Sequence, residues 1–451
     1  MRRDNLLALA ASQQTLPHHG AMRAILCDIT ALNYWRQASA AGGPRSLRWL
    51  ALTPEDMAAS ALPQRTSHVQ VDPPTTSLAG LLDHHGLATP EQPARLLVAR
   101  RKDVRNHPCF TCKVWSTPLP ERSLFPVVLD GTTLRDIYVA SPELAMLQFC
   151  SYGRSTHDLL DALVCAMELC GSYRMLNGEL VPGCPALATP KSLGELARQT
   201  HGRPGSSQLA KVARLTHANS ASPAETSLTL ALSLPYRLGG AHLPISCLNP
   251  TLSLNEAGRR MLGRETISPD MLLQGPNGTR LVIEYDSKSW HDSREQAEYD
   301  ERRRNACAAL GFKCIIVRPR HLANPLQFEA IVASARTNLG VRLQKPPANY
   351  YAKCHDTQDL LFEYWRRPFG LAWGVLDARL PAHTPPSGSA ARAGIRQREK
   401  SRLFSNIHGQ SGALRGTRRP GERLCTLKRT SYVSLDDPTG AKRGALGVRA
   451  C

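Results

Sequence analysis

Residues 269–288 read PDMLLQGPNGTRLVIEYDSK. Two apolar runs flank the tetrapeptide GPNG at 275–278. Glycine, proline and asparagine between two such runs are typical of a tight hairpin turn. We therefore predict one strand at 270–273 and a second at 281–286, paired side by side.

Acidic residues stand at the start of the first strand and at the end of the second. Alternate residues of a strand share a face, so Glu284, Asp286 and Lys288 are expected to point to one side, with Asp270 brought alongside by the hairpin. Clustered carboxylates are costly unless a cation neutralises them, and Mg²⁺ or Mn²⁺ prefers oxygen ligands. A metal-bound water is acidified into a nucleophile, and a nearby lysine can orient it or offset phosphate charge. These are the groups that phosphodiester hydrolysis requires.

Signals for further elements lie on both sides of the hairpin. Ser222 followed by a proline predicts the start of a helix that ends before Pro235. A second helix is predicted at 293–310, and a buried strand at 313–318. The order helix, hairpin, helix, strand predicts an α/β domain at 222–345, in which helices sandwich a small mixed sheet.

At these residues the chain resembles the PD-(D/E)xK superfamily, which has the restriction-endonuclease-like fold. The closer resemblance is to the branch related to very-short-patch-repair endonucleases, and it covers about a quarter of the chain. The resemblance implies a Mg²⁺- or Mn²⁺-dependent endonuclease that cuts DNA with a metal-activated water. The positions that match the motifs of that branch are Glu225, Asp270, Glu284, Asp286, His291, Asp300, Arg303 and Arg304.

Two registers of the acidic strand fit the superfamily pattern. In one, Asp270 is followed by Asp286-x-Lys288; in the other, it is followed by Glu284-x-Asp286. We expect Asp270 and Glu284 to be metal ligands with Asp286 beside them, and Lys288 to be the alternative basic group. Ser287 stands where the family more often has glycine.

Several of these residues also have ordinary structural explanations. Glu225 belongs to a capping sequence, so its carboxylate could simply bond a backbone N–H. His291 could assist proton transfer or contact phosphate, or could be structural. Asp300, Arg303 and Arg304 share a helix face, so the arginines either pair with an acid on a solvated surface or contact phosphate. Lys288 could equally form a surface salt bridge.

The rest of the chain predicts an N-terminal α+β domain for recognition or regulation, which loosely resembles antitoxin-like proteins of bacterial abortive-infection systems. The predicted division of the chain is an N-terminal domain at 22–200, a linker at 201–221, the nuclease-like domain at 222–345, a possible extra helix at 346–380 and a basic tail of low order at 381–451.

Positive charge is concentrated at one end of the chain. The net charge is +19, and residues 391–451 hold 14 Lys or Arg against 4 Asp or Glu, a net of +10. Basic chains bind nucleic acid without sequence preference through counterion release. We expect DNA as a partner, with a possible partner protein at the N-terminal domain. The alternative is a non-catalytic DNA-binding or antitoxin-like regulator on a nuclease scaffold.

Membrane and zinc sites are not expected. No run of 18 apolar residues occurs, and the first residues do not form a convincing signal peptide, so a cytoplasmic protein is predicted. The 13 cysteines lack framework spacing and are expected to be mostly reduced. Cys109 and Cys112, with His107 nearby, lack further ligands at the spacing of a zinc site.

Overall fold

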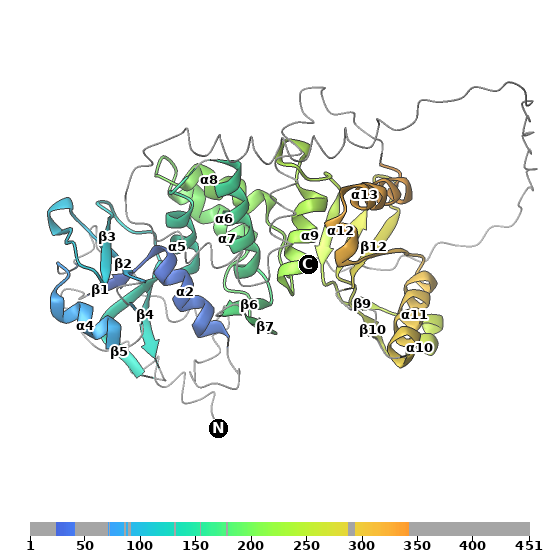
Figure 1. Ribbon diagram of the computed structural model, residues 1–451, viewed down its shortest axis with the longest axis horizontal. Coiled ribbons are helices and arrows are strands. Elements are labelled where there is room, and N and C mark those ends of the chain that lie inside the picture. Colours follow the sequence, from blue (N-terminus) through green and yellow to red (C-terminus); the bar gives the residue numbers. More distant parts are fainter. Residues whose placement is uncertain are drawn as a thin grey trace, which may run out of the picture. The chain divides into compact units, whose positions relative to one another are not determined.

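Apolar runs in the N-terminal part of the chain form a five-stranded mixed sheet (Figure 1). The computed structural model describes residues 24–40, 71, 73–84, 87–88, 92–129, 132–153, 155–176, 179–286 and 294–341. The strand order is β3-β2-β1-β5-β4, in which the β1–β5 and β2–β3 pairs are parallel. The strands are β1 (Ala24–Leu26), β2 (Ala94–Val98), β3 (Phe110–Val114), β4 (Leu124–Leu129) and β5 (Thr132–Ala140). Strands β4 and β5 pair antiparallel, with Phe125 opposite Val139.

Helices pack next to this sheet and next to one another. They are α2 (Asp28–Ser39), α4 (Thr76–His84), α5 (Pro142–Phe149), α6 (Thr156–Leu169), α7 (Pro190–Gln199) and α8 (Ser206–Leu215), with a 3-10 turn η1 at Arg101–Asp103. Ser141 caps α5, since its Oγ accepts the N–H of Leu144 at 3.2 Å. The cap of α6 is Ser155. A hairpin of β6 (Tyr173–Leu176) and β7 (Glu179–Pro182) follows α6.

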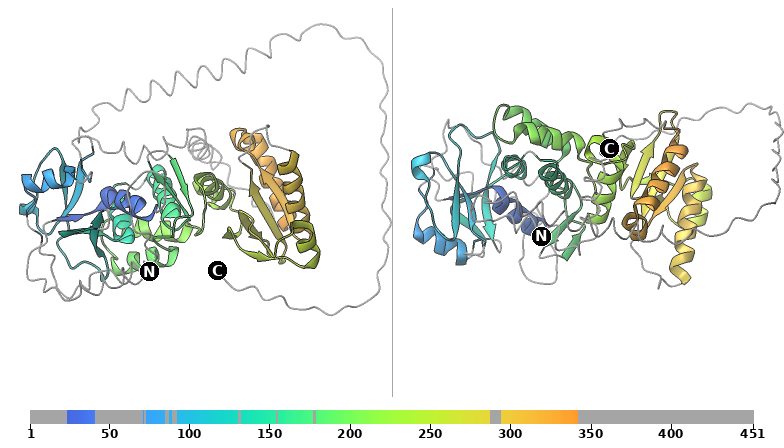
Figure 2. Two further views of the ribbon diagram at one scale, coloured as in Figure 1. Left: turned by 90° about the horizontal axis from the view of Figure 1, so that it is seen from below. Right: turned by 45° about the horizontal axis from the view of Figure 1, so that its top comes forward.

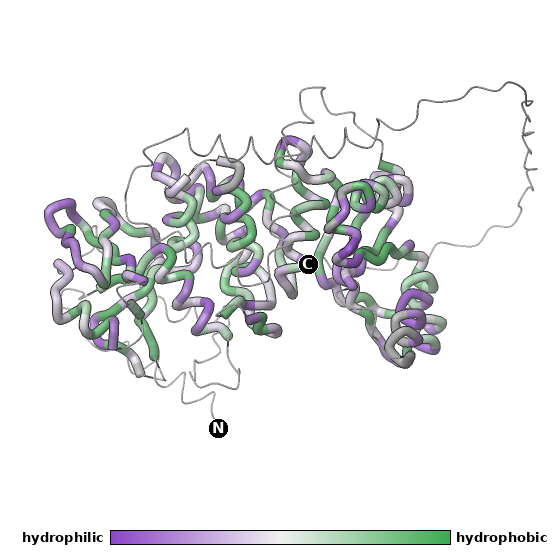
Figure 3. The backbone as a smooth tube through the Cα atoms, viewed as in Figure 1, coloured by the Kyte–Doolittle hydropathy of each residue, from purple (hydrophilic) through white to green (hydrophobic). Residues whose placement is uncertain are grey.

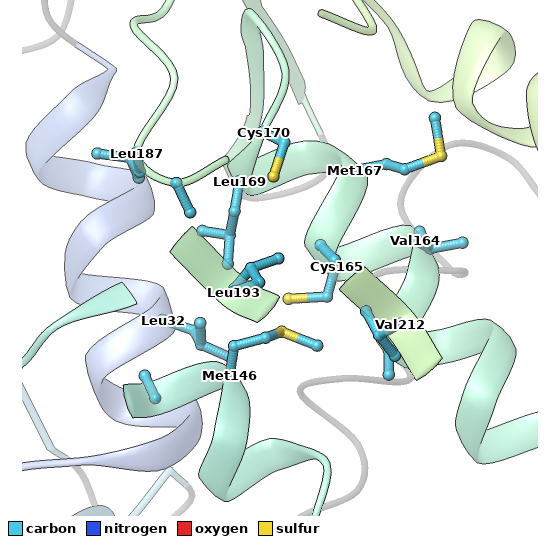
Figure 4. Packing of buried hydrophobic residues seen from close by; sticks show 14 of the residues in the cluster. Leu32, Met146, Val164, Cys165, Met167, Leu169, Cys170, Leu187, Leu193 and Val212 are labelled. Atoms are coloured by element: carbon cyan, nitrogen blue, oxygen red, sulfur yellow. The ribbon is translucent and has the colours of Figure 1, made fainter. Parts of the chain in front are cut away.

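The predicted linker at 201–221 contains a helix that the sequence did not predict, α8, formed by residues 206–215. Leu209 and Val212 are three residues apart, lie on one face of the helix and are buried. Figure 4 shows Val212 in the same cluster as Leu193 of α7 and Cys165 of α6. Leu209 and Val212 therefore anchor this polar segment to the N-terminal core.

The C-terminal part of the described chain holds a second, four-stranded mixed sheet (Figures 1 and 2). Its order is β13-β12-β11-β8: the neighbours β8, β11 and β12 are antiparallel, whereas β13 is parallel to β12. The predicted helix–hairpin–helix–strand order is confirmed by α9 (Pro223–Ser233), β11 (Met271–Gln274), β12 (Arg280–Tyr285), α11 (Arg294–Ala309) and β13 (Lys313–Val317). Elements that were not predicted are η2 (Tyr236–Leu238), β8 (Ile245–Leu248), β9 (Leu252–Ser253), α10 (Glu256–Leu262), β10 (Thr266–Ile267), α12 (Pro319–Ala323) and α13 (Pro325–Leu339).

Both faces of strand β12 are buried. Val282 packs in one cluster with Ala306 and Cys307 of α11, whereas Leu281 and Ile283, which point the other way, belong to the cluster that includes Phe328 of α13. Strands are largely hydrophobic, in contrast to the polar helix α11 (Figure 3). The protein is thus mixed α/β, with helices next to small mixed sheets.

Some predictions lie outside the described residues. The possible helix at 346–380 and the tail at 381–451 are among them. The chain divides into the units Met1–Leu380 and Pro381–Cys451, and all described residues belong to the first. Among the described helices, none combines the length and the apolar character needed to cross a membrane. The ten cysteines of the described residues are free thiols, and six of them are buried.

A buried ion-pair network joins α2, α6 and β6 in the N-terminal core. The carboxylate of Glu168, fully buried, accepts hydrogen bonds from the Arg36 guanidinium at 3.0–3.2 Å and from the N–H of Met175 at 3.0 Å. Arg174 lies beside it, with its guanidinium donating to Ser39 Oγ at 2.8 Å and to backbone carbonyls. Every charge in this network depends on a partner, because water does not reach it.

We expect Glu168→Ala to lower the free energy of unfolding by about 3–5 kcal/mol, because it leaves Arg36 buried without its counter-ion. Urea unfolding measures the change. Glu195→Ala is the matched control: it removes an exposed partner of Lys191, and its effect is expected to be under about 1 kcal/mol. Equal losses in the two variants would contradict a structural role for the buried network.

Candidate functional site

Asp270 lies directly before β11 and is bonded to the strands on both sides of it. Its carboxylate Oδ2 accepts the N–H of Tyr285 in β12 at 2.6 Å. Its backbone carbonyl accepts the N–H of Asn249, next to β8, at 2.9 Å. The hairpin therefore places Asp270 beside the end of β12, as the sequence predicted, and fixes its position through two neighbouring strands.

The pKa of the Asp270 carboxyl is raised to about 7. Burial is the main cause, followed by the negative charges of Glu284 and Glu225. The hydrogen bond from Tyr285 and the charge of Arg303 oppose the rise without cancelling it. Glu225 of α9, Asp270 directly before β11 and Glu284 of β12 are thus electrostatically coupled.

Glu225 has the structural role that its capping sequence predicted and also faces this group. It stands in the first turn of α9, where Oε1 accepts the hydroxyl of Ser222 at 3.0 Å and Oε2 accepts the N–H of Ala221 at 3.0 Å. Oε2 also accepts the side-chain amide of Asn249 at 2.8 Å. The side chain of Asn249 thus joins this carboxylate to the residue whose backbone N–H bonds Asp270, and the charge of Glu225 raises the pKa of Asp270.

Asn249 was not identified from the sequence. Its φ of 48° lies in the left-handed region, which asparagine tolerates better than most residues. In this conformation its backbone N–H reaches Asp270 while its side chain reaches Glu225. The available signal was the dipeptide Asn249-Pro250, which is typical of a turn. That signal does not reveal which acids the turn would join.

Glu284, the second expected metal ligand, is engaged by Arg303 of α11. The guanidinium donates to both carboxylate oxygens at 3.0–3.1 Å and to the carbonyl of Ser268 at 2.6 Å. The side chains of Glu284 and Arg303 are 17% and 28% exposed, so the ion pair is partly open to solvent. Arg303 therefore lies at the site, whereas Arg304 is exposed on α11.

Asp286 follows β12 and pairs with Arg318, which was also not identified from the sequence. Arg318 Nε donates to Asp286 Oδ2 at 3.0 Å, and the backbone N–H of Asp286 donates to the carbonyl of Val317 at 2.9 Å. The side chains of Asp286 and Arg318 are 18% and 43% exposed. Because β12 and β13 are parallel and Tyr285 pairs with Val317, the residues that follow these strands meet.

Three sequence-based assignments cannot be located. Lys288 and His291 lie outside the described residues, as does the side chain of Asp300. The choice between the register through Lys288 and the register through Glu284 therefore stays a prediction.

The donor chemistry of the site suits a hard divalent cation. Glu225, Asp270 and Glu284 offer carboxylate oxygens, the ligands that Mg²⁺ and Mn²⁺ prefer. The pKa of Asp270 is raised first by burial and then by the charges of Glu284 and Glu225, both of which a bound cation would oppose. As they stand, the described residues contain no group of three His, Cys, Asp or Glu placed to hold an ion. Glu284 would have to leave Arg303 to act as a ligand.

Comparisons with models of protein families, with curated proteins and with solved structures find no match to this chain. Function therefore has to be inferred from the chemistry of the site.

The pKa of Asp270 predicts a specific dependence of stability on pH. Its pKa in the folded chain, about 7, lies above the ordinary 3.8, so as pH rises the carboxyl loses its proton in the unfolded chain before it does so in the folded chain. The free energy of unfolding therefore falls as pH rises from about 4 to 7. Asp270→Asn removes this penalty. We therefore expect the difference in the free energy of unfolding between Asp270→Asn and the native chain to grow by roughly 2–3 kcal/mol, in favour of the variant, from pH 5 to pH 8. Urea unfolding with EDTA present measures both chains. A difference that is the same at the two pH values would contradict the shift.

Proposed function

We propose that the chain is a metal-dependent endonuclease of the restriction-endonuclease-like fold that hydrolyses phosphodiester bonds in DNA. The observation that carries the proposal is that Asn249 joins Glu225 to Asp270, and Asp270 in turn accepts the N–H of Tyr285, the residue after Glu284. The charges of Glu225 and Glu284 also raise the pKa of Asp270. The arrangement of the C-terminal sheet supports the proposal: β8, β11 and β12 are antiparallel neighbours between α9 and α11, and β13 lies parallel to β12, with β9, α10 and β10 inserted between β8 and β11.

Each acid has a distinct part in this proposal. Asp270 and Glu284 hold the cation from adjacent strands, and Glu225 approaches from the first turn of α9. Bound there, Mg²⁺ or Mn²⁺ supplies an acidified water and offsets the charge of the phosphate. Asp286 lies beside Glu284 on the strand end, and Arg303 provides a guanidinium that can contact phosphate in a bidentate manner.

A second function is favoured by a different observation. Arg303 holds Glu284 and Arg318 holds Asp286, so two of the acids already have counter-ions from the protein. In a non-catalytic DNA-binding or antitoxin-like regulator on a nuclease scaffold, these two ion pairs would persist and the acids would bind no cation. Such a regulator would bind DNA through its net charge of +19 without cutting it.

The remaining parts of the chain have supporting roles in either case. The basic segment 391–451, with its net of +10, provides affinity for any polyanion. The N-terminal α/β domain is proposed to recognise a DNA target or a partner protein. Neither role requires the acids of the C-terminal sheet.

We expect Mg²⁺- or Mn²⁺-dependent cleavage of plasmid or single-stranded DNA, and a loss of about a hundredfold or more in Glu284→Ala, because a metal ligand is removed. Gel electrophoresis with a metal titration measures the rate. Glu265→Ala is the matched control, since it removes an exposed glutamate that pairs with Arg259. Its activity is expected to stay within about twofold of the native chain.

The two functions give different outcomes in this assay. Cleavage that depends on Glu284 and persists in a chain ending at Leu380 supports the nuclease. DNA binding by that shorter chain without cleavage under any metal condition supports the regulator. Absence of both DNA binding and cleavage would contradict both proposed functions.

A further inference from the structure

The two ion pairs at the strand ends are alike in position and chemistry. Arg303 comes from α11 and Arg318 from the end of β13, and each holds a carboxylate at the end of β12. Both carboxylates are less than one-fifth exposed, whereas both arginines are more open, at 28% and 43%. The arginine side chains are therefore more accessible to an incoming ligand than the carboxylates that they hold.

The same carboxylates are the oxygen ligands that a divalent cation would use. Arg303 holds Glu284 and Arg318 holds Asp286 in the structure as described. A carboxylate oxygen that accepts a guanidinium N–H has less capacity to coordinate a cation, so the arginines and the cation compete for Glu284.

Phosphate oxygens are the natural second partner for these arginines. A guanidinium matches phosphate in the same bidentate geometry that it uses with a carboxylate. If a phosphodiester takes up Arg303 and Arg318, the two acids are released toward the cation, and no arginine is left without a counter-ion.

We propose that Arg303 and Arg318 form a phosphate-binding pair that exchanges partners, holding Glu284 and Asp286 at rest and the phosphate backbone of DNA when the cation binds. This rests on the proposed function and adds a coupling to it: the cation and the phosphate backbone bind cooperatively. Without DNA, the arginines hold the acids and weaken the binding of the cation. Without the cation, the acids hold the arginines and weaken the binding of DNA. By linkage the coupling is the same in both directions.

The test compares the full chain with Arg303→Gln and with Arg259→Gln. Arg259 also pairs with a glutamate at an exposed site, so the control removes the same charge and the same type of ion pair away from the acidic strand ends. Two quantities are measured at fixed salt: the affinity for Mn²⁺ alone, by electron paramagnetic resonance of the free ion, and the affinity for a short DNA duplex, by fluorescence anisotropy with and without Mn²⁺.

Arg303→Gln is expected to bind Mn²⁺ roughly fivefold or more tightly than the native chain in the absence of DNA, because the competitor is gone. The same variant is expected to show a smaller gain in DNA affinity upon adding Mn²⁺ than the native chain and Arg259→Gln show. Arg318→Gln is expected to shift both quantities in the same direction.

Other outcomes separate the exchange from the proposed function. Native Mn²⁺ binding that is lost in Glu284→Ala but is unchanged or weakened in Arg303→Gln would overturn the exchange and leave the metal site standing. Binding that tightens equally in Arg303→Gln and Arg259→Gln would also overturn it, since only overall charge would then matter. Absence of Mn²⁺ binding with and without DNA would overturn both.

Discussion

The partial burial of one carboxylate, that of Asp270, is the constraint around which the acidic end of the C-terminal sheet is arranged. A partly buried acid near Glu284 and Glu225 is unfavourable, which is why its pKa rises to about 7. The N–H of Tyr285 donates to the carboxylate and offsets part of this cost, whereas Asn249 donates to the backbone carbonyl and fixes the position of the residue. These bonds bring the ends of three strands together, and the other charged groups are arranged around that point.

Local signals made the frame of this domain predictable. The turn tetrapeptide at 275–278 set the hairpin, and β11 and β12 lie within about one residue of the ranges predicted for them. Helix α11 matches its predicted range equally well, because a cap and a terminal glycine mark its ends. Each of these signals is contained in a few consecutive residues, so no knowledge of distant contacts was required. The predicted acids at 270 and 284 followed from that frame.

The contacts of the site were not predictable in the same way, because they depend on strand order. Asn249 reaches Asp270 only because the four-residue strand β8, which has no clear pattern, pairs with β11. Arg318 meets Asp286 only because β13 lies parallel to β12 with Val317 opposite Tyr285. Helix α8 was missed for a related reason, since Leu209 and Val212 are too few to mark a helix until α7 and the core cover them. These contacts are determined by strand pairing and helix packing between distant parts of the chain, which a local sequence pattern does not contain.

The balance between the two candidate functions turns on which acids the protein neutralises by itself. Glu284 and Asp286 have arginine partners, so their presence alone is compatible with an inert scaffold. Asp270 differs, because it is partly buried, is repelled by two other acids and is incompletely compensated by Tyr285 and Arg303. In a protein that only needed the fold, asparagine would accept the same N–H bond from Tyr285 at this position without any charge penalty. A partly buried acid retained at this cost suits a site for a cation, and perturbed carboxyls of this kind are concentrated at functional sites. The energetics of Asp270 therefore favour the metal-dependent enzyme over the scaffold.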